Sequence, residues 1–129
     1  MGERPYPEPD PDTGRFWEAV SAGRFEIQRC TACARHVFYP RLHCPHCGSA
    51  ELQWVSASGR ATVHSYTVVH RAPPAFAEEA PYVVALVDLE EGPRMMTRLL
   101  GIEPGAVEIG MRVRVAIEGD PPLPYFRRS

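Results

Sequence analysis

The chain has 129 residues, 44% of them hydrophobic, so it holds one domain or two very small ones. It contains no apolar run near about 18 residues and no charged-then-apolar leader, so we expect no membrane association and a reducing cytoplasm. All fourteen basic residues are arginine and the net charge is -2, which argues against sequence-independent binding of nucleic acid.

The first dozen residues predict an extended, solvated segment. Acidic residues alternate there with prolines, at Pro5, Pro7, Pro9 and Pro11. Proline fixes φ and keeps the preceding residue extended, so residues 1–12 are predicted to form a stiff proline-rich linker or a disordered tail. A linker implies an upstream domain.

A short amphipathic helix is predicted next. Thr13 or Asp12 can cap it, and Gly23 can end it. One face carries apolar side chains, at Phe16, Trp17 and Val20. About ten residues do not hold a helix in water by themselves, so this face must dock on a core.

The four cysteines are the only thiols of the chain and form two C-x-x-C pairs, Cys30, Cys33, Cys44 and Cys47. Each pair turns two thiolates toward one point, and together they can hold a zinc ion at about 2.3 Å. Two disulfides are the alternative, which the regular spacing disfavours. His36, His43 and His46 lie close by, but four well-spaced thiolates favour a closed all-cysteine site. Such a site leaves no position for water, so the predicted Zn²⁺ is structural.

Short strand patterns alternate with the two pairs of cysteines. Residues 25–29 lead into the first pair, residues 36–40 return from it, and residues 51–55 follow the second. This order predicts a rubredoxin-like zinc ribbon, and we assign residues 13–57 to the helix and ribbon. Because the apolar lining is too small to fold alone, we expect the metal to supply much of the stability, on the order of 10 kcal/mol in small zinc peptides.

The remainder, residues 58–129, predicts a second all-β unit. Residues 61–70 are rich in β-branched residues, and residues 82–89 are almost continuously apolar, as in a central strand covered on both sides. Residues 111–117 alternate as a strand with one buried face does. With one long bent strand, these segments fill a five-stranded OB-fold barrel. Residues 121–128 are predicted to be a tail that lies across a partner. The fold class is mainly β.

Seven motifs follow one another over about residues 15–126: F-W-E-A, Q-R-C-T-A-C, F-Y-P-R, C-P-H-C-G-S, S-Y-T-V-V-H-R, P-Y-V-V-A-L-V-D-L-E-E-G-P-R and I-G-M-R-V-R-V. A single C-x-x-C pair is a weak signal. The ordered set resembles the DUF35 family, the zinc-ribbon OB-fold proteins.

The resemblance implies an accessory role in acyl-CoA metabolism, because members of this family are subunits of thiolase-fold enzymes. In one branch the domain is fused to, or encoded beside, a hot-dog-fold enoyl-CoA hydratase half. That branch partners a lipid-transfer-protein-type aldolase, which splits steroid side-chain CoA thioesters by a retro-aldol reaction. In another branch the partner is a true thiolase. The proline-rich linker favours the aldolase branch.

The cysteine, glutamate and histidine side chains that could act in catalysis are each better explained by a structural or solvent-exposed role. Thiolysis needs a thiolate, and all four thiols are assigned to zinc. Glu90 and Glu91 fit a solvated hairpin tip better than paired catalytic carboxylates. His64 and His70 share a strand with Tyr66, where exposed or satisfied histidines are the favoured interpretation. We therefore expect a subunit that is not catalytic alone.

The loop of residues 70–82 is the predicted contact region for a partner or for the partner's acyl-CoA, since OB-folds present ligands on such loops. Its predicted contact residues are Arg71, Phe76 and Tyr82, a cation for phosphate or carboxylate and two aromatic anchors. The alternative folds the loop back, so that Phe76 fills the barrel mouth. A nucleic-acid-binding OB module is a further alternative, which the acidic net charge disfavours.

Overall fold

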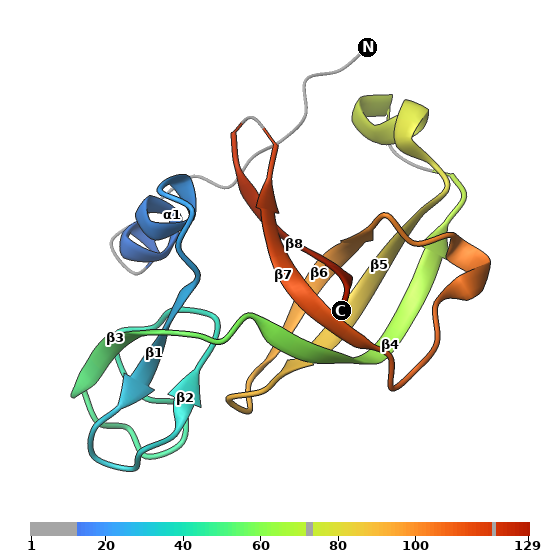
Figure 1. The fold of residues 1–129 in the computed structure, drawn as a ribbon. Coiled ribbons are helices and arrows are strands. Elements are labelled where there is room, and N and C mark those ends of the chain that lie inside the picture. Colours follow the sequence, from blue (N-terminus) through green and yellow to red (C-terminus); the bar gives the residue numbers. More distant parts are fainter. Residues whose placement is uncertain (1–12, 72–73, 120) are drawn as a thin grey trace.

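The computed structural model describes residues 13–71, 74–119 and 121–129. A helix and a small ribbon lie beside a closed barrel (Figure 1). The predicted fold class is confirmed: the chain is mainly β, with one N-terminal α-helix, a zinc-ribbon region and a C-terminal OB-fold barrel. The proline-rich segment, residues 1–12, lies outside the described residues.

Helix α1 (Gly14–Ser21) follows Thr13, which is the N-cap residue although its side chain makes no capping hydrogen bond. The chain then turns at Gly23, where φ is 79° and the N–H donates to the carbonyl of Val20. Phe16 and Val20 are almost completely buried, so the apolar face docks as predicted. Among the described residues, no helix is long and apolar enough to cross a bilayer.

The ribbon is an antiparallel sheet of three strands in the order β2-β1-β3. The central strand β1 (Glu26–Cys30) pairs with β2 (His36–Val37) and with β3 (Leu52–Ser56). Strand β2 is shorter than predicted because Phe38 turns away to pack against Phe16, with 5.4 Å between the ring centroids. The helix and the ribbon are thereby held together by aromatic contacts.

Five strands close the barrel in the order β4-β5-β6-β8-β7. Their bounds are β4 (Arg60–Val69), β5 (Tyr82–Leu89), β6 (Arg94–Leu100), β7 (Arg112–Glu118) and β8 (Leu123–Arg128). Two 3-10 helices lie in the longer connections, η1 (Pro74–Glu79) and η2 (Pro104–Ala106). A register shift between Val63 and Ser65 interrupts the pairing of β4 with β5, and such bulges bend a long strand.

The C-terminal residues form a barrel strand and not the tail that the sequence predicted. Strand β8 pairs antiparallel with β7 and, at Phe126 and Arg127, parallel with β6. Prolines argue against a strand, which is why the sequence pattern misled. Pro124 is tolerated because the β6 pairing does not extend to it, so that side of the strand carries no ladder at this point. Phe126 is fully buried in the core.

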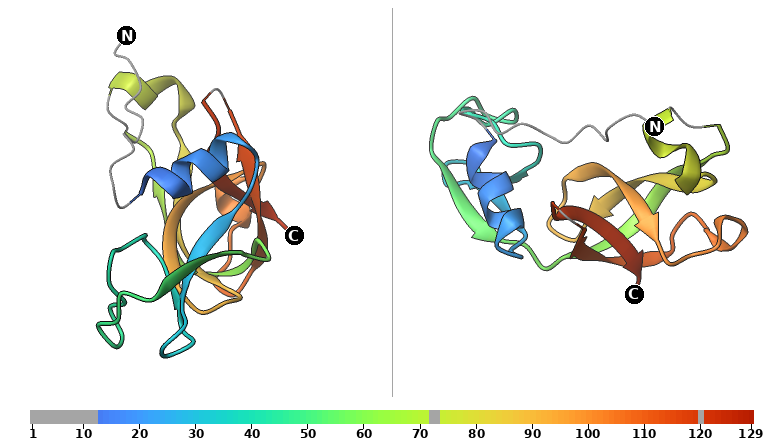
Figure 2. Two further views of the ribbon diagram at one scale, coloured as in Figure 1. Left: turned by 90° about the vertical axis from the view of Figure 1, so that its left-hand side faces the viewer. Right: turned by 90° about the horizontal axis from the view of Figure 1, so that it is seen from above.

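The larger of two buried hydrophobic clusters runs through the helix, the ribbon and the barrel. Phe16 and Val20 from α1 and Ile27 from β1 belong to the same buried cluster as the inward side chains of β5. The rings of Phe25 and Phe126 meet edge to face, with 6.2 Å between their centroids. Helix α1 contacts both β1 and β8 and lies beside the ribbon strands where the ribbon meets the barrel (Figure 2).

Candidate metal centre

Two knuckles of matching geometry bring the four cysteines together. In the first, the N–H of Ala34 donates to the carbonyl of Cys30 at 2.8 Å. In the second, the N–H of Gly48 donates to the carbonyl of Cys44, also at 2.8 Å. Ala34 and Gly48 have positive φ angles, 66° and 79°. Each knuckle therefore reverses tightly after its second cysteine, which directs both of its sulfurs to one side.

The four sulfurs fit a tetrahedral zinc ion. All Sγ atoms lie within 4.8 Å of one another. The Sγ–Sγ distance is 3.6 Å between Cys30 and Cys47 and 3.7 Å between Cys33 and Cys44. Four sulfurs about 2.3 Å from one ion at tetrahedral angles would be roughly 3.8 Å apart. A disulfide would bring two sulfurs to about 2 Å, and all four thiols are free.

The thiols of the cluster differ in acidity. Burial raises the pKa of Cys44, but hydrogen bonds from the backbone N–H groups of His46 and Cys47 and from the thiols of Cys33 and Cys47 together outweigh it and lower the pKa to about 7. A backbone hydrogen bond at Ser49 lowers the pKa of Cys47, whereas the thiol of Cys30, burial and the other two thiols raise it to about 12. Because crowded thiolates repel one another, a divalent cation is what keeps all four ionised.

Apolar side chains cover one side of the cluster, whereas Cys47 is exposed. Cys30 and Cys44 are buried together with Val37, and Leu52 packs against them. Among the described residues, the four cysteines are the only group of three or more histidine, cysteine or acidic side chains placed to hold a metal. The nearby histidines are therefore outside the cluster. The arrangement is that of a closed, structural site.

Gln28 positions the loop between the two knuckles, a role that the sequence pattern did not reveal. Its side chain is buried in β1 and donates to the carbonyl of Arg41 at 2.8 Å, while its oxygen accepts from the N–H of Arg41, also at 2.8 Å. This two-point clamp satisfies the buried amide and fixes the approach to Cys44. Gln28 directly follows Ile27 in a short predicted strand, and this was the available signal.

The paired glutamates connect the barrel to the ribbon. Arg60 donates through Nε to Glu90 at 2.7 Å, and the backbone N–H of Ser58 donates to Glu91 at 2.7 Å. Glu91 therefore binds the segment that joins β3 to β4, and Glu90 binds the first residue of β4. They are more than the solvated hairpin tip that the sequence predicted.

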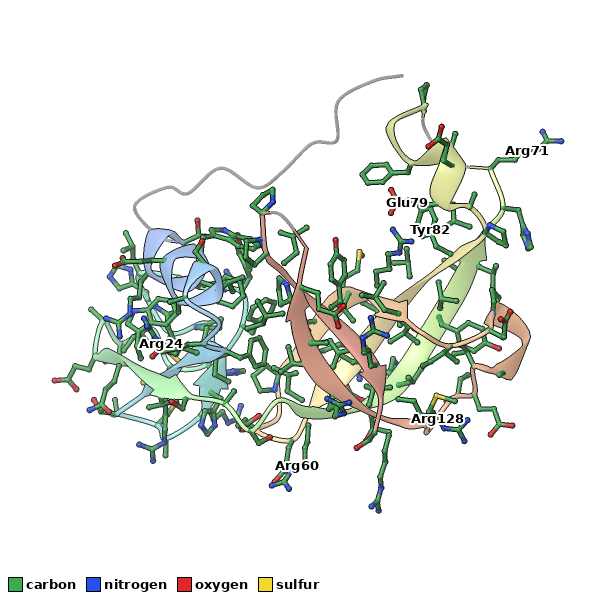
Figure 3. All side chains as sticks on the ribbon, turned by 45° about the horizontal axis from the view of Figure 1, so that its top comes forward. Arg24, Arg60, Arg71, Glu79, Tyr82 and Arg128 are labelled. Carbon is green, nitrogen blue, oxygen red and sulfur yellow. The ribbon has the colours of Figure 1, made fainter. Side chains whose placement is uncertain are left out.

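The predicted contact residues of the barrel loop do not share one location. Phe76 in η1 lies 6.4 Å from the ring of Tyr82, measured between centroids. Tyr82 also packs under the guanidinium of Arg98, whose Cζ is 4.5 Å from the ring centroid. Arg98 donates to Glu79 at 2.7 Å. Arg71 is exposed and projects away from Glu79 and Tyr82 (Figure 3).

Two domain families match the chain. The rubredoxin-like zinc ribbon domain of ChsH2 matches residues 17–53, and the C-terminal OB-fold domain of ChsH2 matches residues 54–118. A DUF35 domain-containing scaffold protein of Methanocaldococcus jannaschii is 39% identical over 71% of this chain and 70% of its own length. The chain belongs to the DUF35 family. The geometry of the four sulfurs and the match to the zinc ribbon domain together identify the cofactor as structural Zn²⁺.

The chain is also similar to a protein of known name and to a solved structure. A Mycobacterium tuberculosis protein named 3-oxo-4,17-pregnadiene-20-carboxyl-CoA hydratase alpha subunit is 42% identical over 84% of this chain. The chain spans only 34% of that protein. A solved structure described as Ltp2-ChsH2(DUF35) aldolase matches with a TM-score of 0.85 and 46% identity, covering 95% of this chain and 98% of that one.

Proposed function

We propose that this DUF35 chain is a non-catalytic accessory subunit that binds and stabilises a thiolase-fold aldolase of the Ltp2 type. The observation that carries the proposal is the match to the DUF35 chain of the Ltp2-ChsH2 aldolase. At 46% identity over nearly both chains, the identical positions outnumber the buried residues, so many of them lie on the surface. Surface identity supports a shared partner as well as a shared fold.

The metal centre supports a structural role. We assign Cys30, Cys33, Cys44 and Cys47 as the ligands, since their sulfurs are spaced for one tetrahedral ion. The closed site offers no coordination position to water or substrate. Zinc thiolates persist in a reducing compartment, so we place the protein in the cytoplasm.

The proposed substrate of the partner is a steroid side-chain acyl-CoA. A hydratase adds water to an enoyl-CoA and gives a β-hydroxyacyl-CoA. A retro-aldol enzyme then breaks the bond between the α and β carbons of that product. The M. tuberculosis relative is named for the hydration of a steroid carboxyl-CoA, which would supply this substrate. Residues 1–12 would link the chain to an upstream hydratase domain.

Co-expression tests the proposal directly. We expect the chain and an Ltp2-type aldolase from the same organism to elute as one stoichiometric complex. The complex should split a β-hydroxyacyl-CoA steroid into a short acyl-CoA and a steroid carbonyl compound without consuming free CoA. A complex that instead cleaves a β-ketoacyl-CoA and consumes free CoA would identify a thiolase partner, the second candidate function. An aldolase that is fully soluble and active alone, with no complex formed, would refute the proposal.

Replacing one zinc ligand tests how assembly depends on the metal. Cys44→Ser leaves three thiolates, and we expect the variant to lose zinc, unfold the ribbon and fail to bind the aldolase. Zinc content by atomic absorption and complex formation by size exclusion are the measurements. Thr31→Ser, an exposed change inside the first knuckle, is the matched control and should keep both. A zinc-free Cys44→Ser variant that still assembles would contradict a structural role for the metal.

A further inference from the structure

Two adjoining hollows form one apolar groove across the described surface. The first, of about 500 Å³, lies between α1 and the barrel and is lined by Trp17 and Tyr39. The second, of about 300 Å³, lies under η1 and is lined by Phe76 and Tyr82. Met96, Arg98 and Tyr125 line both hollows, so the two are continuous.

The floor of the apolar groove is the outer side of two barrel strands. Val84 of β5 stands opposite Arg98 of β6, and both line the second hollow together with Met96. Strand β5 was predicted to be covered on both sides, but only its inner side belongs to the core, and the apolar outer residues Val84 and Leu86 stay partly exposed. Met96 is 69% exposed although it lies within a strand. An apolar outer strand face of this kind is typical of an interaction site.

Arg98 gives the groove a chemical preference. Its side chain is 20% exposed, and Nη1 donates to Glu79 at 2.7 Å. Its Nε is buried and has no hydrogen-bond partner among the described residues. That buried nitrogen is out of reach of a partner, but the side chain is partly exposed, so the outer N–H groups of the guanidinium can donate to an oxygen acceptor of a bound segment.

We propose that the apolar groove is the docking site for the thiolase-fold partner, which places apolar side chains beside Met96 and an oxygen acceptor at Arg98. This inference rests on the proposed function. Tryptophan, tyrosine, methionine and arginine are the residues enriched at protein interfaces and their hot spots, and they line this groove. Both hollows are open to solvent, whereas a site for an acyl chain would enclose most of its ligand.

A charge placed at the groove centre tests the inference. Met96→Asp should weaken binding of the Ltp2-type aldolase at least a hundredfold, because the carboxylate would be buried in an apolar contact. Ile109→Asp is the matched control, since Ile109 is equally exposed, at 71%, and lines neither hollow. Binding is measured by titration calorimetry, and unchanged zinc content and melting temperature show that both variants are folded.

The outcomes separate the inference from the proposed function. Selective loss of binding in Met96→Asp supports the groove as the docking site. Wild type, Met96→Asp and Ile109→Asp binding alike would overturn the groove and leave the accessory function standing. If the wild type binds no Ltp2-type aldolase, the proposed function itself fails. A wild-type homodimer that only Met96→Asp dissociates, or binding of palmitoyl-CoA that it alone abolishes, would also overturn the inference.

The acceptor at Arg98 has its own test. Arg98→Lys keeps the positive charge beside Glu79 and removes the guanidinium N–H groups that would donate to the acceptor. We expect the dissociation constant for the aldolase to rise about tenfold, the effect of one lost hydrogen bond to a charged group. An unchanged dissociation constant in a folded variant would show that the partner brings no acceptor to this position.

Discussion

Ala34 and Gly48 occupy the same position in the two knuckles, directly after the second cysteine of each pair. Both have the left-handed backbone conformation, with φ of 66° and 79°. In that conformation Cβ crowds the following carbonyl and costs an L-residue roughly 1–2 kcal/mol, whereas glycine has no Cβ. The first knuckle therefore carries backbone strain that the second does not.

Substituting these two residues one at a time should change the free energy of unfolding in opposite directions. Ala34→Gly is expected to stabilise the zinc-bound protein by about 0.5–1 kcal/mol, since part of the relief is offset by the greater freedom of glycine in the unfolded chain. Gly48→Ala should destabilise it by about 1 kcal/mol through the backbone alone, because a Cβ there meets no atom within 4 Å. Thermal unfolding followed by circular dichroism checks both, at about 4 °C per kcal/mol. Identical melting temperatures would disprove the strain.

At the scale of elements, an ion pair links the last two strands of the barrel. Arg127 of β8 donates through Nη2 to Glu118 of β7 at 2.7 Å, and its Nε donates to the other carboxylate oxygen. These hydrogen bonds lower the pKa of Glu118 despite the desolvation that opposes them. They also raise the pKa of Arg127. A lowered carboxyl pKa stabilises the fold only where the unfolded carboxyl is ionised as well.

Glu118→Gln should therefore cost stability at neutral pH and very little in acid. The contribution of the pair is fully present above the ordinary glutamate pKa of about 4.3 and is lost as pH falls through the lower pKa of the folded state. The difference in melting temperature between wild type and variant is measured from about pH 7 to about pH 3. Because both proteins lose zinc alike in acid, the difference isolates the pair. The control is Glu108→Gln, at an exposed residue that pairs with no described cation. A difference that persists undiminished in acid would refute this assignment.

Features that depend on residues close together in the chain could be predicted from the sequence, whereas features that depend on distant residues could not. The knuckles and strands β5 and β7 depend on local spacing and alternation, so they were predictable. Strand β8 depends on pairing partners far along the chain, and its prolines concealed it. The apolar groove depends on which side of β5 and β6 faces outward once the barrel closes. Periodicity alone finds two apolar sides of β5 but not the side that stays uncovered.

For the whole molecule, the shared core determines how far the zinc ion acts. Phe25 precedes β1 in the ribbon, and its ring contacts Phe126 in the barrel. Phe16 and Val20 belong to the same buried cluster as the barrel residues Val83 and Val87. Unfolding the ribbon would therefore expose apolar surface of the barrel as well. A chain of this size with one continuous core is expected to unfold as a single cooperative unit.

Zinc removal tests this cooperativity, and the chain supplies a separate probe for each half. Both tryptophans, Trp17 and Trp54, lie in the helix and ribbon, whereas most strand residues belong to the barrel. With zinc bound, tryptophan fluorescence and far-ultraviolet circular dichroism should report one melting temperature. After chelation, the loss of the metal contribution should lower the barrel transition by at least about 10 °C, because its end near Phe126 loses its cover. If the fluorescence signal disappears while the dichroism transition stays in place, the ribbon and barrel are independent units.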